Sequence, residues 1–171
     1  TLVCLDVRTG KRVWHYQITH HDIWNYDLPQ APILANVNVN GRSVKAIVGL
    51  TKQAYAYVLD RVTGQPIWPI EERPVPQSDV PGEDNRWATQ PVPVKPKAIS
   101  RQGFQPSELA KYTPEHEKAC ADMMAVEGGL RSDGPFTRYN TMLSIQFPGT
   151  LGASNWHGMS YSPSEGLLFV N

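Results

Sequence analysis

The chain has 171 residues, in which 16 lysines and arginines balance 16 aspartates and glutamates. This balance predicts neither nucleic-acid binding nor attachment to an anionic membrane. No apolar run reaches the roughly 18 residues that a membrane-spanning helix needs. The two cysteines, Cys4 and Cys120, are too far apart in sequence to indicate a metal-binding pair.

A strand–turn–strand unit occurs twice in the sequence. Strands are predicted at 2–6 and 12–17, around a turn in which Gly10 supplies a positive φ. The pattern Asp-x-x-Thr-Gly-x-x-x-Trp of residues 6–14 returns at 60–68, and residues 161–167 repeat the turn without the tryptophan. Such units are typical of propeller blades, because one small sheet buries both its faces only against neighbours.

The segment between the two repeats predicts one four-stranded blade at 31–70. Apolar runs at 31–39 and 43–51 flank Asn40-Gly41, which is a strong signal for a hairpin turn, and a further strand is predicted at 53–59. Eight prolines follow between residues 66 and 96. Because proline has no N–H to donate, this stretch is predicted to be an extended excursion outside any sheet.

A single helix is predicted near 114–126, ending at Gly128-Gly129. Thr113 suits the N-cap and Pro114 the first helical position. Residues 98–112 are predicted as irregular or helical, and the sheet pattern resumes at 151. The expected fold is therefore all-β, with blade strands at 1–70, a Pro-rich insertion at 71–150 and the start of a further blade at 151–171. Since the chain begins and ends in predicted strands, residues 1–171 are expected to be a fragment of one longer domain.

The densest group of polar side chains lies at residues 20–29. This segment combines two histidines, two carboxylates, a carboxamide and two aromatic rings, and it lacks the alternation of a strand built for packing. Its polar groups can coordinate a metal, move protons or bind a polar ligand, and its rings can line a pocket. The alternative is a polar loop whose hydrogen bonds are all satisfied locally.

Four segments match one known family in order along the whole chain. They are His-His-Asp-Ile-Trp-Asn-Tyr-Asp at 20–27, Lys52 ahead of Val-Leu-Asp-Arg at 58–61, Arg-Pro-Val-Pro-Gln at 73–77, and Phe-Pro-Gly-Thr-Leu-Gly at 147–152 with Trp-x-Gly-Met-Ser at 156–160. With the two tryptophan repeats, they resemble the pyrroloquinoline quinone (PQQ) dependent dehydrogenases, and the glucose dehydrogenase branch more than the methanol dehydrogenase branch. The resemblance implies part of an eight-bladed β-propeller, about two to three blades of it.

The resemblance also implies an activity. Members of this family hold PQQ and a calcium ion, or a lanthanide in some cases, and the ion polarises a quinone carbonyl. A base removes the proton from the substrate hydroxyl while hydride passes to the quinone. The expected substrate is a sugar, polyol or similar alcohol, and the expected electron acceptor is a quinone or cytochrome. The resemblance further implies a periplasmic location and allows a membrane anchor elsewhere in the full-length protein.

Three residues match cofactor-binding positions of the family. Lys52 matches the cation that reaches the quinone oxygens and stabilises negative charge on them. Asn155 matches a position whose amide bonds to PQQ in methanol dehydrogenases. Trp156 is a further cofactor-binding candidate, although for this ring packing between blades is the favoured interpretation.

Asn25 departs from the family pattern, because it aligns with the catalytic aspartate. A neutral carboxamide cannot act as a general base, but its oxygen can bind calcium. Asp27, two residues on, would share its side of an extended segment, which makes Asn25 and Asp27 candidate metal ligands. Asp27 or Asp22 is the favoured replacement base, and His21 is a further candidate. A non-catalytic propeller that serves as a scaffold or binding protein is the alternative function.

Overall fold

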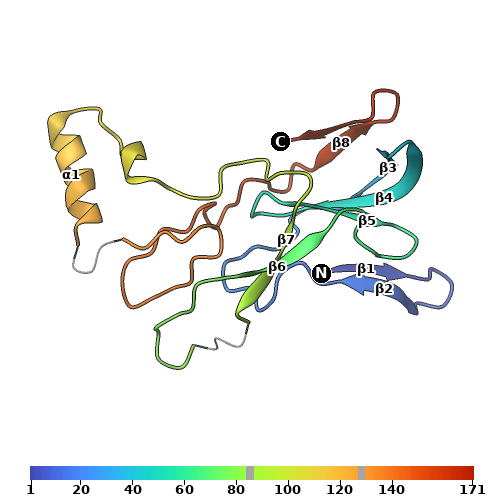
Figure 1. Cartoon of the computed structure of the whole chain (residues 1–171), viewed down its shortest axis with the longest axis horizontal. Helices are drawn as coiled ribbons and strands as arrows, with labels where there is room; N and C mark the ends of the chain where they lie inside the picture. Colours follow the sequence, from blue (N-terminus) through green and yellow to red (C-terminus); the bar gives the residue numbers. More distant parts are fainter. Residues whose placement is uncertain (84–86, 127–129) are drawn as a thin grey trace.

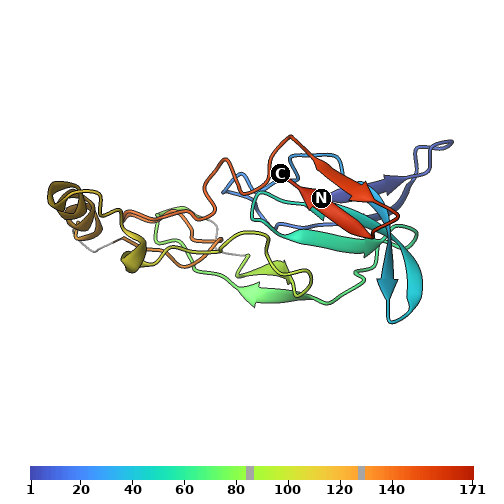
Figure 2. The same cartoon turned by 90° about the horizontal axis from the view of Figure 1, so that it is seen from above.

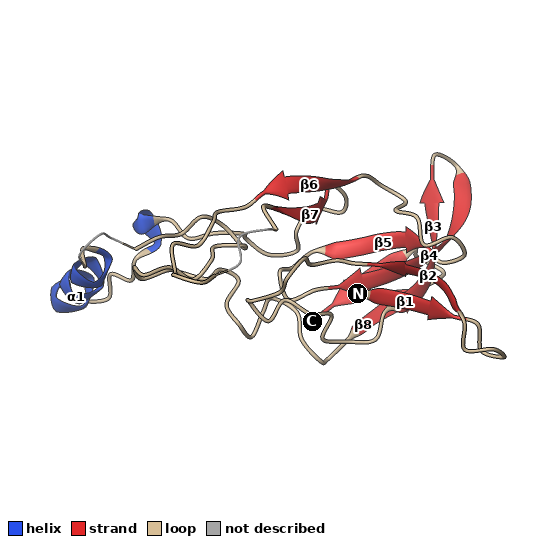
Figure 3. Ribbon diagram, turned by 90° about the horizontal axis from the view of Figure 1, so that it is seen from below, coloured by secondary structure: helices blue, strands red, loops and turns tan. Residues whose placement is uncertain are grey.

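The computed structural model describes residues 1–83, 87–126 and 130–171. The strands gather at one end of an elongated molecule, and helix α1 (Pro114–Met124) lies at the opposite end (Figures 1 and 3). The strands form small antiparallel sheets: β1 (Leu2–Leu5) with β2 (Arg12–Tyr16); β3 (Ile33–Val39), β4 (Arg42–Leu50) and β5 (Ala56–Asp60); β6 (Ile70–Pro74) with β7 (Thr89–Pro93); and β8 (Met159–Ser162) with β9 (Leu167–Val170). None of these sheets closes on itself, which agrees with the expectation that the chain forms part of a propeller. Among the described residues, no helix is long and apolar enough to cross a membrane.

The β3–β4–β5 sheet has a neighbouring hairpin packed on each face. Val48 and its same-face neighbours pack against Leu168 and Val170 of the β8–β9 hairpin. On the opposite face, Leu59 packs with Leu2 and other residues of the β1–β2 hairpin. Because side chains alternate between the two faces of a strand, one sheet serves both contacts. The three sheets therefore stack as neighbouring blades, which Figure 2 shows from above.

The tryptophan repeat joins one blade to the next. Trp14, at the end of the first copy, donates from Nε1 to the carbonyl oxygen of Arg61 in the turn of the second copy, at 3.1 Å. The two turns are built alike. Asp6 accepts the backbone N–H groups of residues 8 and 9, and Asp60 those of residues 62 and 63. These bonds lower the pKa of both carboxyl groups.

The predicted hairpin at Asn40-Gly41 is confirmed, but the predicted four-stranded blade has only three strands. Val39 pairs with Arg42 across the turn, and both turn residues have positive φ, as a two-residue hairpin requires. Where a fourth strand was expected, Pro66 makes an isolated bridge to Leu59, flanked by a bond from the Asp60 N–H to the Gln65 carbonyl and one from the Ile67 N–H to the Val58 carbonyl. β5 begins at residue 56 and not 53, since residues 51–55 form a tight turn.

The prediction that the Pro-rich stretch lies outside any sheet is wrong. β6 and β7 pair in register from Ile70 opposite Pro93 to Pro74 opposite Thr89. Both strands of a two-stranded sheet are edges, so a proline can turn its N–H-free side away from the partner. Helix α1 begins as predicted, with the Thr113 side chain accepting the N–H of residue 116, but it ends at residue 124. The predicted stop at Gly128-Gly129 lies outside the described residues, and the division into blade and insertion segments stays a prediction.

Candidate functional site

Loop 20–27 turns its aromatic rings inward. Trp24 and Tyr26 are 1% and 0% exposed and pack edge-on against Phe136 of the insertion, with ring centroids 5.3 and 5.8 Å away. Trp24 donates from Nε1 to the Thr137 carbonyl, and the Tyr26 hydroxyl donates to the Pro148 carbonyl, both at 2.7 Å. Burial raises the pKa of Tyr26, so the hydroxyl keeps its proton. The insertion therefore sets the position of this loop.

The polar residues between and after these rings point outward. Asn25 adopts a left-handed backbone with φ of 66°, a conformation that asparagine tolerates better than most residues. Its Nδ2 donates to the Thr150 carbonyl at 3.2 Å. Asp27 is half-exposed and its Oδ1 lies 2.8 Å from Nζ of Lys52. Both side chains thus contact the segments that surround Lys52.

Lys52 is the buried cation of the site, with a side chain only 9% exposed. It lies in the tight turn before β5, and its carbonyl accepts the N–H of Ala153 at 3.0 Å. Gly152 lies so close that an added β-carbon would be 2.5 Å from Cβ of Lys52. Three segments far apart in sequence, 25–27, 52 and 150–153, therefore meet at one place. The last glycine of the Phe-Pro-Gly-Thr-Leu-Gly motif, Gly152, is the sequence feature that permits this close contact with Lys52. The sequence analysis assigned Gly152 no role.

The other candidate bases are bonded elsewhere. Asp22 accepts the backbone N–H of Trp24 at 3.0 Å and that of Tyr26 at 3.0 and 2.8 Å. His21 is exposed and places Nε2 3.8 Å from Oε1 of Glu83. Only Asp27 among the three candidate bases lies against Lys52.

The two candidates on the last segment form a local turn. Asn155 donates from Nδ2 to the Leu151 carbonyl at 3.1 Å and accepts the N–H of Trp156 at 3.0 Å. Trp156 is 83% exposed in this chain, and its packing between blades stays a prediction. Roles of Asn155 and Trp156 in cofactor binding stay predictions.

The described residues contain no group of three or more histidine, cysteine, aspartate or glutamate side chains placed to hold a metal ion. Asn25 and Asp27 could supply only part of the roughly six to eight oxygen ligands that calcium takes. Their role as metal ligands stays a prediction.

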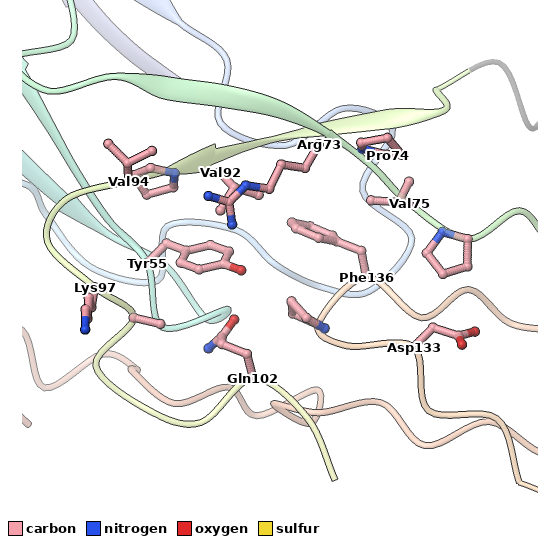
Figure 4. A pocket seen from close by; sticks show the side chains of 14 residues that line it. Tyr55, Arg73, Pro74, Val75, Val92, Val94, Lys97, Gln102, Asp133 and Phe136 are labelled. Carbon is pink, nitrogen blue, oxygen red and sulfur yellow. The ribbon is translucent and has the colours of Figure 1, made fainter. Parts of the chain in front are cut away.

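A cavity of about 470 Å³ lies between the β6–β7 hairpin and the segments at 97–102 and 133–136 (Figure 4). Tyr55 and Phe136 form its inner wall, and Phe136 also packs against Trp24 and Tyr26. Arg73 and Lys97 add positive charge to its lining. The lining does not include Asn25, Asp27 or Lys52, so the cavity is separate from the polar side of the loop.

Comparison with known proteins gives consistent matches. The family model described as "PQQ: Glucose/ethanol/alcohol dehydrogenase, beta-propeller domain" matches residues 1–171. Over the whole chain, the sequence is 36% identical to a quinate/shikimate dehydrogenase (quinone) of Acinetobacter baylyi, and over 99% of it 37% identical to a quinoprotein glucose dehydrogenase of Gluconobacter oxydans. The chain spans about a fifth of the length of these relatives: 21% and 20%.

The fold also matches solved structures. The crystal structure of the quinohemoprotein alcohol dehydrogenase of Comamonas testosteroni superposes on 98% of the chain with a TM-score of 0.52 and 27% identity, and the match covers 18% of that protein. The predicted fold class, part of a β-propeller, is thereby confirmed.

Proposed function

We propose that this chain, which belongs to the PQQ glucose/ethanol/alcohol dehydrogenase β-propeller family, is part of an enzyme that oxidises the hydroxyl group of a sugar, polyol or similar alcohol. The observation that supports this best is the meeting of Lys52, Asp27 and Asn25 against the backbone at Gly152. The buried ammonium and the carboxamide can donate to the oxygens of a polar, negatively charged cofactor, and the carboxylate can accept a proton.

The residues present fit PQQ, which has carboxylates and two adjacent quinone oxygens. When bound, PQQ supplies the acceptor for the hydride of the alcohol. Lys52 would bind the quinone oxygens through its buried ammonium and stabilise negative charge there. Asn155 and the exposed ring of Trp156 would add an amide donor and a flat apolar surface. The absence of a side chain at Gly152 lets the 149–153 backbone close against Lys52.

The carboxylate of Asp27 is our preferred base for the substrate hydroxyl proton. It is half-exposed, so a substrate can reach it, and it lies 2.8 Å from the ammonium that would bind the cofactor. Asn25, which is neutral, would offer Oδ1 to a calcium or lanthanide ion. The proposed assignment therefore gives proton removal and ion binding to different residues.

The electron acceptor and the location are proposed from the relatives. The Acinetobacter baylyi relative is named as a quinone-dependent dehydrogenase, and the Comamonas testosteroni relative as a quinohemoprotein. We accordingly propose a quinone or cytochrome as the acceptor and the periplasm as the compartment. A membrane anchor would lie in other parts of the full-length protein.

The test is PQQ-dependent oxidation by the full-length protein. The apoprotein would receive PQQ and calcium, an artificial electron acceptor, and a panel of aldoses, polyols, hydroxy acids and simple alcohols. Lys52→Ala should abolish activity and weaken PQQ binding, whereas Lys45→Ala, an exposed lysine of β4, should change neither. Asn25→Asp reports whether the family's usual base can be restored at this position.

The comparisons do not favour a non-catalytic scaffold. The one observation that supports it is that Asn25 stands where the family has its catalytic aspartate. A protein that binds PQQ but oxidises substrates only as Asn25→Asp would support that alternative. A wild-type protein that neither binds PQQ nor oxidises any of the panel would reject the proposed enzyme.

A further inference from the structure

We propose that Asp22 is a positioning residue that holds Asn25 and Asp27 in place, and not the base that accepts the substrate proton. The kinetic consequences of this inference rest on the proposed function. The hydrogen-bond geometry that supports it is independent of that function. It removes one of the two carboxylates that the sequence left as favoured bases.

The Asp22 carboxylate is turned toward its own loop. Its Oδ1 accepts the N–H groups of Trp24 and Tyr26, each at 3.0 Å, and its Oδ2 accepts the Tyr26 N–H at 2.8 Å. Two backbone N–H groups thereby engage both oxygens of the carboxylate, with the Tyr26 N–H shared between them. A general base needs a lone pair aimed at the substrate hydroxyl, and this carboxylate aims its own at the peptide backbone.

The two bonded N–H groups flank Asn25, whose backbone is in the left-handed region. Asn25 has φ of 66°, and such a conformation persists only where its surroundings hold it. The N–H groups on both sides of it are fixed by one carboxylate. On the other side of the loop, Gln146 donates from Nε2 to the Trp24 carbonyl at 2.9 Å. The direction in which the Asn25 side chain leaves the loop is therefore set by Asp22 and Gln146 together.

The position of Asp27 depends on the same hydrogen bonds of Asp22. The buried Tyr26 lies between Asn25 and Asp27, and its N–H is the donor that Asp22 binds with both oxygens. If the Tyr26 peptide turned, Asp27 would move relative to Lys52, from which it is now 2.8 Å away. A displacement of about 1 Å at a reacting group can cost about a hundredfold in rate, so a residue without substrate contact can control turnover.

Asp22→Asn and Asp22→Ala distinguish the two roles. Asn keeps an oxygen that can accept both N–H groups bound by Oδ1, but it cannot act as a base. We expect Asp22→Asn to retain kcat within about tenfold of the wild type and Asp22→Ala to lose about a hundredfold. The acid limb of the pH profile of kcat/KM should persist in Asp22→Asn and disappear in Asp27→Asn.

The matched control is Asp6→Ala. Asp6 also accepts two backbone N–H groups in an exposed turn, but this turn belongs to the β1–β2 hairpin and not to the site. Asp6→Ala should leave turnover per folded molecule unchanged.

Hydrogen exchange gives a readout that does not depend on activity. In Asp22→Ala, but not in Asp6→Ala, the amides of Trp24 and Tyr26 should exchange at least tenfold faster. Unchanged exchange at both amides would overturn the positioning role even if the protein proved to have no PQQ-dependent activity. An Asp22→Asn variant as inactive as Asp22→Ala, with normal exchange and no acid limb, would instead identify Asp22 as the base.

Discussion

The indole of Trp14 covers Gly64 so closely that a β-carbon at position 64 would lie 2.6 Å from the ring. Both residues belong to the same sequence motif, Trp14 to its first copy and Gly64 to its second. The glycine serves two purposes, because its φ of 75° allows the turn and its missing side chain admits the ring. The repeat therefore encodes the contact between blades as well as the shape of each blade.

Gly64→Ala should destabilise the protein much more than Gly10→Ala. Both glycines have positive φ, but a β-carbon at Gly10 would meet nothing within 4 Å. We expect the free energy of unfolding to fall by about 1 kcal/mol at either position because of the backbone conformation. At Gly64 it should fall by about 1–3 kcal/mol more because the indole is displaced. Urea unfolding of the full-length protein measures both values, and equal losses would show that the ring does not depend on the glycine.

Gly152→Ala should weaken cofactor binding. The added methyl would lie 2.5 Å from Cβ of Lys52 and would displace the lysine or the 150–153 backbone. Gly166→Ala is the control, since it has a similar positive φ and open space around it. We expect at least a tenfold loss of PQQ affinity in Gly152→Ala only, measured by titration of the apoprotein. Equal affinities in the two variants would mean that Lys52 does not bind PQQ from this position.

The Lys52–Asp27 ion pair should respond asymmetrically to substitution. Lys52→Met leaves a half-exposed carboxylate that water can solvate, so we expect a change in stability below about 1 kcal/mol. Asp27→Asn leaves a buried ammonium with a weaker acceptor, and we expect a loss of about 1–3 kcal/mol. Denaturant unfolding of both variants and of the double variant gives the coupling energy. A larger loss for Lys52→Met would contradict the burial of the lysine.

Acid should loosen the contact between residues 78–80 and 139–141. The Thr141 N–H and hydroxyl donate to Asp79 at 2.7 and 2.8 Å and lower the pKa of its carboxyl below the ordinary 3.8. The stabilisation is therefore complete above pH 3.8 and is lost as the pH falls through the lowered value in the folded protein. Exchange of the Thr141 amide should accelerate across this window, beyond the intrinsic pH effect, in the wild type but not in Asp79→Asn. Equal pH dependence in the two proteins would show that the Asp79 carboxylate does not hold this contact.

Features that depend on neighbouring residues in the sequence were predictable. The Asn40-Gly41 hairpin, the turns at Gly10 and Gly64 and the start of the helix at Thr113 each follow from the φ values and donors of a few adjacent residues. The pairing of β6 with β7 was not predictable in this way. Their prolines argue against a sheet locally, and they are acceptable because, in the part of the chain that the structure describes, β6 and β7 pair only with each other.

The sequence by itself determined which polar groups are candidates for the site: the 20–27 segment stands out by its residue types, and Lys52 by the resemblance of its flanking residues to the family. The tertiary structure decided which of these groups face one another. Asp22 and Asp27 are chemically identical and five residues apart, yet one binds the loop backbone and the other binds Lys52. The reason is that the insertion draws Trp24 and Tyr26 inward through Phe136, and this burial fixes which way each neighbouring carboxylate points.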